Sequence, residues 1–444
     1  MAFGERQAGS IGSISEGKRM FSKEDNERLC RVGADTPMGK TFRSMWMPFL
    51  MPEELPGPDC PPIRVRLLGE DLVAFRDTQG KIGLLDRYCP HRRVDLFFGR
   101  NEECGLRCVY HGWKFDVSGA IVDMPAEPEN TRMKADTRIK SYPVIEWGGV
   151  IWAYMGDPEH MPARPPELEW GLVPPDFRFI TKRLQRTNYA QGVEGGIDSS
   201  HVGILHSHLD AAHPELPFRQ RQVSPNLAIP YLASDTAPKF FVRPTDYGMA
   251  IGARRNAGDT SYYWRVTQFL APFYTMIAPI KEGRAYMGHA WTPIDDDNCW
   301  VFTMTWNSDR PLSQEELDHG AVHSDVMNDG SYRPLVSADT DYGIDRLRQR
   351  LHSSTGIEGI GMQDTAVQES MGPIVDRSRE NLGSGDAAIV GFRKALLKLA
   401  TQLETAGVLD VAHHPEWYRV RSTAAILEHG VDFQAGTAAA TTVA

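Results

Sequence analysis

The sequence predicts an α+β protein with two domains: an all-β domain near the N-terminus, and a larger domain that combines an antiparallel sheet with helices. Three observations support this prediction. The chain has 444 residues, which is more than one hydrophobic core usually organises. Residues 62–156 contain short apolar runs separated by turns, whereas residues 239–307 contain longer strand patterns. An apolar stripe at helical spacing follows those strands.

The N-terminal part divides into two regions. Residues 1–43 are expected to pack on the larger domain, with a partly disordered beginning, because residues 1–20 are polar and rich in glycine and serine. Residues 44–160 are expected to form the all-β domain, since "PIRVRLL", "LVAFRD" and "IGLLDRYC" are strand-like runs separated by turn residues. The proline-rich stretch 156–176 that ends this region indicates a linker.

Residues 161–444 are expected to form the larger domain. A helix-like stretch at 188–206 precedes the long strands, and turns are predicted at 246–248 and 295–298. A later helix is indicated by apolar residues that step by 3, 4, 3 and 4, and we interpret this stripe as core packing. The stripe consists of Ile389, Phe392, Leu396, Leu399 and Leu403. The tail "AGTAAATTVA" is expected to be disordered.

Composition excludes several function classes. The net charge of −10 argues against nucleic acid or an anionic membrane as partner, because both require a basic surface. No run of eighteen apolar residues is present, and the N-terminal residues lack the apolar segment of a secretion signal. Six cysteines are too few for a disulfide framework in a chain of this length. We therefore expect a cytoplasmic protein without disulfides.

Two Cys–His pairs lie in the stretch "CPHRRVDLFFGRNEECGLRCVYHGW". Cys89 and His91 form the first pair, and Cys108 and His111 form the second, with sixteen residues between the pairs. Zinc fingers usually place two cysteines on one arm and two histidines on the other, so structural zinc is the weaker alternative. One cysteine and one histidine on each arm suit a cluster in which one iron takes both thiolates and the other takes both imidazoles. Such ligation raises the potential to roughly −150 to +300 mV.

The flanking residues strengthen this interpretation. Pro90 follows the first cysteine, and Gly112 and Trp113 follow the last histidine, which together with the spacing gives the Rieske 2Fe–2S signature. Cys104 is not needed by the pattern and is expected to be a free thiol.

A second polar pattern lies in the helix-like stretch. Five polar residues step by 3, 3, 4 and 3, which places them on one side of a helix. They are Asn188, Gln191, Glu194, Asp198 and His201. A solvated helix face is the alternative, but the neighbouring residues are apolar, and Gly195 and Gly196 would weaken an exposed helix by about 1 kcal/mol each. A buried polar stripe needs partners, and metal ligation would supply them.

His201 and His206 are candidate iron ligands. Five residues correspond to about 140° of helical rotation, so the rings converge only if the helix ends or bulges between them. Two histidines and one carboxylate form the facial triad of non-haem Fe(II) oxygenases. Asp364, in "GIGMQDTAVQES", is our preferred carboxylate. It ranks slightly above three other candidates, which are Asp339, Asp345 and Asp376.

Together these motifs resemble the large (oxygenase) subunit of the Rieske non-haem iron aromatic-ring-hydroxylating oxygenases. The segments "CPHRR…GLRCVYHGWKFD" and "MQDTAVQESMGPIVDRSRENLG" are similar to the phthalate dioxygenase-like branch. The resemblance implies an N-terminal all-β Rieske domain and a C-terminal helix-grip catalytic domain, in which an antiparallel sheet curves over a long helix. It also implies one 2Fe–2S cluster and one mononuclear non-haem Fe(II) per chain.

The resemblance assigns roles to these residues. Cys89 and Cys108 would bind one cluster iron and His91 and His111 the other, whereas the catalytic iron would be bound by His201, His206 and Asp364. Asp198 would bridge His111 of one subunit to His201 of a neighbour, so that one subunit's cluster serves the next subunit's iron. The implied assembly is a homotrimer or a stack of trimers.

The resemblance further implies a function in the catabolism of aromatic compounds. The chain would use O₂ and two electrons to hydroxylate, most simply to cis-dihydroxylate, an aromatic carboxylate such as a phthalate isomer. Gly356, Gly359 and Gly361 do not form a dinucleotide fingerprint, so the electrons would come from an NADH-dependent reductase of the flavin and ferredoxin type. The alternatives are a monooxygenase or O-demethylase acting on a substituted benzoate, and a pure Rieske electron carrier.

A substrate carboxylate requires an arginine or hydroxyl donors in the pocket. Ser199 lies between two residues of the iron motif, and Arg254 lies on a predicted strand near it. We predict that both contact the substrate, and we rank Arg254 above Arg243 and Arg255.

Overall fold

The computed structural model describes residues 21–129, 132–223, 230–279, 283–321 and 325–443. The expected disorder of residues 1–20 lies outside these ranges. Among the described residues, no helix combines the length and the apolar character needed to cross a membrane.

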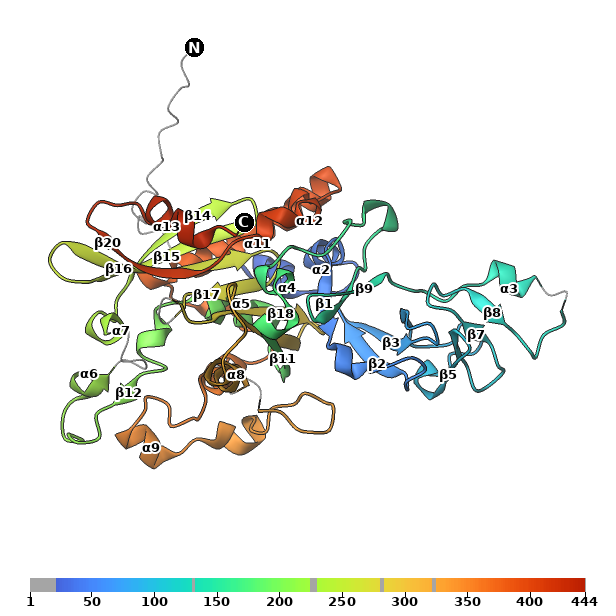
Figure 1. The fold of residues 1–444 in the computed structure, drawn as a ribbon, viewed down its shortest axis with the longest axis horizontal. Coiled ribbons are helices and arrows are strands. Elements are labelled where there is room, and N and C mark those ends of the chain that lie inside the picture. The colour runs from blue at the N-terminus through green and yellow to red at the C-terminus, as the bar shows by residue number, and fades with distance from the viewer. Residues whose placement is uncertain (1–20, 130–131, 224–229, 280–282, 322–324, 444) are drawn as a thin grey trace, which may run out of the picture.

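The all-β region consists of three small antiparallel sheets, with orders β1-β10-β9, β2-β3-β4 and β5-β6-β7-β8. Figure 1 shows it as an arm at one end of the molecule, with β7 and β8 farthest from the larger domain. The short strands confirm the all-β prediction. Their bounds are β1 (Met47–Leu50), β2 (Ile63–Leu67), β3 (Glu70–Arg76), β4 (Ile82–Asp86), β5 (Arg100–Glu102), β6 (Gly105–Arg107), β7 (Lys114–Phe115), β8 (Ile121–Asp123), β9 (Val144–Trp147) and β10 (Val150–Ala153).

The larger domain is built on an eight-stranded antiparallel sheet of order β11-β19-β18-β17-β16-β15-β14, with β20 paired to β16. The predicted turns at 246–248 and 295–298 join β14 to β15 and β18 to β19. The bounds are β11 (Arg178–Gln185), β14 (Lys239–Thr245), β15 (Gly248–Asn256), β16 (Ser261–Leu270), β17 (Tyr274–Ile277), β18 (Tyr286–Pro293), β19 (Cys299–Trp306) and β20 (Thr423–Glu428). A separate small sheet pairs β12 (His208–Leu209) with β13 (Gln222–Val223).

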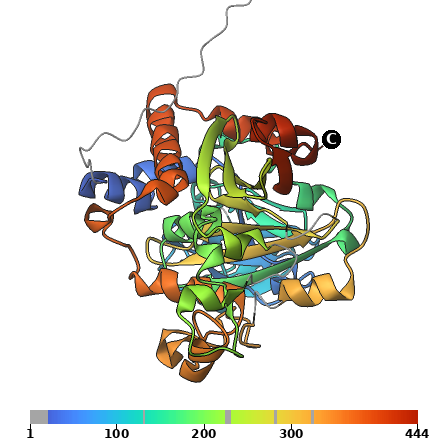
Figure 2. The same ribbon diagram turned by 90° about the vertical axis from the view of Figure 1, so that its left-hand side faces the viewer.

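Helices cover both sides of this sheet. α5, α8 and α11 pack on one side of it, and α13 packs on the other, where Phe433 stacks on Trp264. Figures 1 and 2 show α11 beside the N-terminal helices. The long helix α11 packs on β14 and β15, and α5 packs on β17 and β18. Apart from α3 (Met133–Asp136) in the arm, the described helices are α1 (Lys23–Cys30), α2 (Pro37–Arg43), α4 (Glu169–Leu172), α5 (Tyr189–Ile197), α6 (Phe218–Arg221), α7 (Tyr231–Ser234), α8 (Gln314–Ala321), α9 (Arg346–Leu351), α10 (Ile360–Ser370), α11 (Ala387–Ala406), α12 (Asp410–His413) and α13 (Phe433–Thr441).

The predicted apolar stripe forms the inner side of α11. Phe392 and Leu396 are fully buried, and Phe392 packs edge-on against Phe269 of β16. On its other side α11 contacts α1 and α2, so the N-terminal helices lie against the larger domain.

Two expectations about irregular segments are wrong. The proline-rich stretch 156–176 is not a free linker, because Glu169 and Trp170 are buried and the Glu169 carboxylate accepts hydrogen bonds from Trp306 and Arg421. The C-terminal tail is not disordered over residues 435–441, which belong to α13. Asp432 caps α13, and Phe433 anchors it by stacking on Trp264 of the sheet.

Candidate metal centres

Two hydrogen-bonded turns carry the Cys–His pairs. Cys89 follows β4, where its N–H donates to the Val94 carbonyl (2.9 Å), and Cys108 follows β6, where its N–H donates to the Trp113 carbonyl (2.8 Å). Gly112 has a φ of +77°, and a Cβ there would lie 2.5 Å from Pro125 Cγ. The turn therefore requires glycine directly after His111.

The two thiols and the two imidazoles differ in their exposure to solvent. Cys89 and Cys108 are buried, and the hydrogen bond that the two thiols share lowers the pKa of Cys108. His91 and His111 are partly exposed, and their ring centroids are 4.5 Å apart. The His91 ring also stacks on Trp113 at 4.7 Å. A dry pair of thiols beside a more exposed pair of imidazoles fits a cluster with two unlike iron positions.

Helix α5 ends at Ile197, earlier than predicted, because the helix-like stretch was expected to reach His206 and to end or bulge between His201 and His206. Asn188 caps its start and Asp198 lies at its C-cap, after which His201 begins a 3₁₀ turn (His201–Gly203). The helix therefore stops before His201, and the chain between His201 and His206 is not a regular α-helix. The rings of the two histidines can then converge, with centroids 5.1 Å apart.

The glycines of α5 allow the helix to lie directly on the sheet. A Cβ at Gly192 would lie 2.1 Å from Cδ1 of Trp291, and a Cβ at Gly196 would lie 2.3 Å from Cη2 of the same ring. Trp291 belongs to β18. The helix is weak in isolation because glycine is a poor helix former, and close packing on the tryptophan explains why glycine is present.

The structure brings His201, His206 and Asp364 together. Asp364 Oδ1 lies 3.5 Å from His201 Nε2 and 3.3 Å from His206 Nε2, and one ligand atom from each residue lies within 4.8 Å of the others. Asp364 comes from the first turns of α10. Two imidazole nitrogens and one carboxylate oxygen are the donor set of a facial triad.

Electrostatics keep this site ionised. Burial opposes the charged form of Asp364, but its interactions with the His206 and His201 rings lower the pKa of Asp364 below its usual value. Burial likewise opposes ionisation of Asp198, and the hydrogen bond from His201 lowers its pKa. For His201, burial acts against protonation, whereas Asp198 and Asp364 raise the pKa. The two carboxylates therefore remain anionic beside the imidazoles.

The other candidate aspartates lie elsewhere. Asp376 caps a 3₁₀ turn (Arg377–Arg379), and Asp345 caps α9. Asp339 is exposed and makes an ion pair with Arg186. Each of these carboxylates has a local structural role or faces solvent, which separates them from Asp364.

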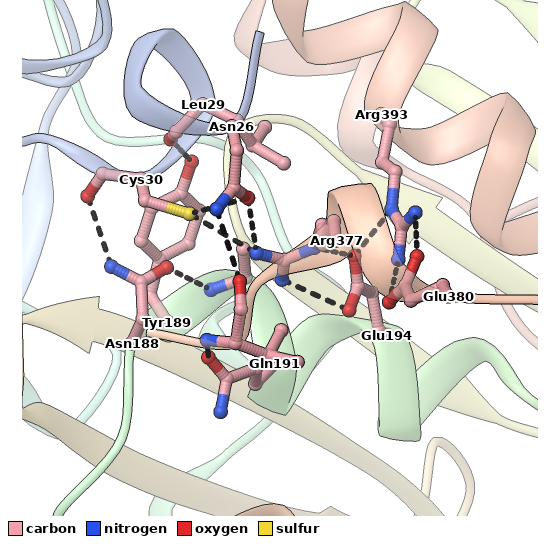
Figure 3. A network of polar contacts seen from close by, with 12 residues as sticks. Asn26, Leu29, Cys30, Asn188, Tyr189, Gln191, Glu194, Arg377, Glu380 and Arg393 are labelled. Carbon is pink, nitrogen blue, oxygen red and sulfur yellow. Dashed lines mark hydrogen bonds and ion pairs between the residues drawn. The ribbon is translucent and has the colours of Figure 1, made fainter. Parts of the chain in front are cut away.

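The polar stripe of α5 has a different explanation from the one that we expected. Figure 3 shows that Glu194 meets two arginines from later in the chain, Arg377 and Arg393. Its carboxylate accepts from Arg377 (3.0 Å to each oxygen) and from Arg393 (2.7 Å). Arg377 also donates to Asn26 of α1 (2.9 Å). The first part of the stripe therefore joins α1, α5 and α11 through a buried ion network, and only its end reaches the histidines.

Asp198 and Ser199 lie beside the candidate iron ligands. Asp198 Oδ2 is 3.2 Å from His201 Nδ1, and Asp198 Oδ1 accepts from the Ser200 N–H (2.7 Å). Ser199 is buried. Its carbonyl accepts from Arg255 Nη2 (2.7 Å), and its hydroxyl lies 3.4 Å from Arg255 Nη1.

Arg254 does not lie on this side of the sheet, so its predicted role is wrong. Its guanidinium lies over the rings of Phe241, Tyr262 and Trp264, at 5.1, 4.0 and 5.8 Å from their centroids. Those rings pack towards α13. Because neighbouring residues of a strand face opposite sides, Arg255 points towards Ser199 instead.

Sequence reasoning also missed Arg265 of β16. It is only 5% exposed, its Nε has no hydrogen-bond partner among the described residues, and its positive charge acts against protonation of His201. Arg265 and Ala253 are register partners on adjacent strands. Arg265 therefore shares a sheet face with Arg255, which is two residues after Ala253. The alternation of side chains along a strand does not reveal which face of the sheet covers the iron site. The sequence therefore does not indicate that Arg255 and Arg265 lie together on that face.

Comparisons with known proteins agree with this geometry. A family described as "Rieske [2Fe-2S] domain" matches residues 45–143, and one described as "LigXa C-terminal domain like" matches residues 153–444. The chain is 40% identical to the phthalate 4,5-dioxygenase oxygenase subunit of Pseudomonas putida, over 85% of this chain and 86% of that protein. It is 36% identical to the 3-chlorobenzoate-3,4-dioxygenase oxygenase subunit of Comamonas testosteroni, over 94% of this chain and 97% of that protein.

A solved structure shares the fold. The structure of dicamba monooxygenase bound to dicamba aligns with a TM-score of 0.56 at 21% identity, over 82% of this chain and 98% of that chain. The chain belongs to the Rieske non-haem iron aromatic-ring-hydroxylating oxygenases, as a large (oxygenase) subunit of the phthalate dioxygenase-like branch, and its cofactors are a Rieske 2Fe–2S cluster and a mononuclear non-haem iron.

Proposed function

We propose that this subunit hydroxylates an aromatic carboxylate, most simply a phthalate isomer, by cis-dihydroxylation with O₂ and two electrons. The observation that carries the proposal is the juxtaposition of a histidine–histidine–aspartate site with two buried arginines. Within the described residues, neither Arg255 nor Arg265 makes a salt bridge to a carboxylate. An anionic substrate would supply the missing partner beside the iron.

The two groups of metal-binding side chains assign the ligands of each iron. Cys89 and Cys108 would hold one iron of the cluster, and His91 and His111 the other. His201, His206 and Asp364 would hold the mononuclear iron and leave positions open for O₂. Iron in that site supplies the redox chemistry that reduces O₂, while Asp198 holds the His201 ring through Nδ1 so that Nε2 faces Asp364.

Arg255 and Arg265 would orient the substrate by its carboxylate. Burial and the nearby positive charge of Arg265 lower the pKa of Arg255 to about 10. Two desolvated cations side by side are costly in the free enzyme. A carboxylate placed between them would relieve that repulsion and would accept charge-assisted hydrogen bonds. Ser199, which Arg255 contacts, would lie at the same end of the substrate.

Replacing Arg265 by glutamine is expected to raise KM for the aromatic acid by about 10- to 100-fold. Loss of a hydrogen bond to a charged group costs about 1.5–3 kcal/mol, and each 1.4 kcal/mol is about tenfold. Steady-state kinetics measure this change. The matched control is Arg254→Gln on the opposite face of the sheet, which is expected to leave KM unchanged.

The neutral amide of the same substrate separates recognition from folding. It should bind wild type and Arg265→Gln about equally, because it carries no charge for Arg265 to meet. An unchanged KM for the acid in Arg265→Gln, or a raised KM in Arg254→Gln, would contradict the proposed substrate site.

The separation between the Cys–His turns and the iron ligands within one chain supports an assembly of several subunits. In Figure 1 the strands that flank the Cys–His turns lie at one end of the molecule, and β12, which follows His206, lies near the other. Within the same chain the cluster is thus remote from the iron. Near the two sites, exposed apolar side chains offer contact surface. They are Phe98, Val109, Tyr110 and Ile204. We propose a homotrimer or stacked trimers in which His111 of one subunit meets Asp198 of the next.

A separate reductase completes the system. The sequence contains no dinucleotide fingerprint, so we propose an NADH-dependent reductase of the flavin and ferredoxin type as electron donor. A cytoplasmic location is also proposed. Its support is that the cysteines form no disulfides, which suits a reducing compartment.

Turnover of phthalate isomers and of methoxy- or chlorobenzoates under ¹⁸O₂ tests the proposed function. Dihydroxylation places both labelled atoms in one aromatic product, ring monooxygenation places one there, and O-demethylation places one in the released formaldehyde and none in the aromatic product. Purified protein is expected to contain about three irons per chain, two in the cluster and one mononuclear. About two irons per chain and no labelled product from any of these acids would identify a pure electron carrier and contradict the proposal.

A further inference from the structure

We infer that Gln363 is a positioning residue that fixes His206 in the tautomer able to bind the mononuclear iron. The inference rests on the proposed metal site. Gln363 Oε1 lies 2.8 Å from His206 Nδ1, on the side of the ring opposite to the nitrogen that faces Asp364. His206 is 7% exposed, so the amide takes the place that water would hold at an exposed ring.

The orientation of the amide is determined by its other contact. Gln363 Nε2 donates to the Ile357 carbonyl (3.0 Å). The reversed amide would place two oxygens against each other at Ile357, so the carbonyl end must face His206. An amide oxygen only accepts hydrogen bonds. His206 Nδ1 therefore carries the proton, and the lone pair of Nε2 points to Asp364 and to the metal position.

The two histidines thus have chemically different partners. His201 Nδ1 faces the Asp198 carboxylate at 3.2 Å, whereas His206 Nδ1 faces a neutral amide. Asp198 and Asp364 already place two carboxylates against the histidines. A neutral partner orients His206 without adding a third negative charge. Since Gln363 directly precedes Asp364 on α10, one helical turn supplies both a ligand and the group that orients another ligand.

Fe(II) titration tests this inference without relying on turnover. Protein freed of mononuclear iron, with its cluster retained, is titrated anaerobically with Fe(II). Gln363→Leu removes the acceptor and is expected to weaken Fe(II) binding by about 10- to 100-fold, the usual effect of losing such a hydrogen bond. The electron paramagnetic resonance signal of the reduced cluster should not change. Gln363→Glu retains an acceptor oxygen and should restore most of the affinity.

Control variants separate positioning from folding. Gln368→Leu, on the same helix, breaks the bond from Gln185 (2.6 Å) and should keep wild-type Fe(II) affinity. Gln363→Met, which keeps the length of the side chain, gives the same test should the leucine variant not fold. If Gln363→Leu and Gln363→Met bind Fe(II) as wild type does, while His206→Ala does not, the inference is wrong and the proposed function stands. If His206→Ala also keeps the iron, the proposed metal site itself is wrong.

Discussion

Asp364→Ala is expected to lose the mononuclear iron and to abolish turnover while the cluster stays intact. The variant should contain about two irons per chain in place of about three. Asp364 contributes the only carboxylate of the triad and lies against both imidazoles, at 3.5 and 3.3 Å. Two neutral imidazoles alone bind Fe(II) poorly, because the negative charge that balances the cation is lost. Iron analysis and the cluster's electron paramagnetic resonance signal measure the two centres separately.

Asp376→Ala is the matched control for Asp364→Ala. Asp376 was a rival ligand by sequence, but its carboxylate caps a 3₁₀ turn by accepting from the Ser378 N–H (3.1 Å). Its loss is expected to cost about 1 kcal/mol of stability, as for other capping residues, with iron content and turnover retained. An Asp364→Ala protein that still holds three irons, or an Asp376→Ala protein that loses one, would overturn the assignment.

Local patterns determined most of the fold, which is why the sequence could predict it. The turn at 295–298 ends one long strand and starts the next, and the apolar stripe of α11 repeats at the helical period. The metal motifs were equally local. Cys89 and Cys108 lie on turns a few residues from their paired histidines, and the spacing of His201 and His206 alone indicated that no regular helix runs through both, although α5 ends already at Ile197.

Features that depend on distant partners could not be predicted. Glu194 looked like part of a metal-binding stripe because its partners, Arg377 and Arg393, are 183 and 199 residues away. The choice of Arg254 over Arg255 failed for a related reason. Adjacent strand residues face opposite sides, and only the packing of α13 and α5 shows which side covers the iron.

Asp198→Asn is expected to slow electron transfer from the cluster by about 10- to 100-fold while keeping both metal centres. The carboxylate holds His201 Nδ1 at 3.2 Å, and in the proposed trimer its other contact would be the neighbour's His111. Asparagine offers one acceptor oxygen in place of two and an amide that repels an N–H donor. It therefore cannot hold both rings at once, and the loss of such a hydrogen bond to a ligand histidine typically costs about 10- to 100-fold.

Rapid mixing of the reduced enzyme with O₂ and substrate measures this step as oxidation of the cluster. Asp210→Asn is the matched control, because Asp210 caps a nearby turn by accepting from the Ala212 N–H (2.8 Å) and should leave the rate unchanged. Cluster oxidation at the wild-type rate in Asp198→Asn would exclude this carboxylate from the electron route. A slow rate accompanied by loss of the mononuclear iron would instead assign Asp198 to orienting His201 alone. Slow oxidation with full iron content is the outcome that a bridge between subunits requires, since only then do both metals remain while the contact between them is broken.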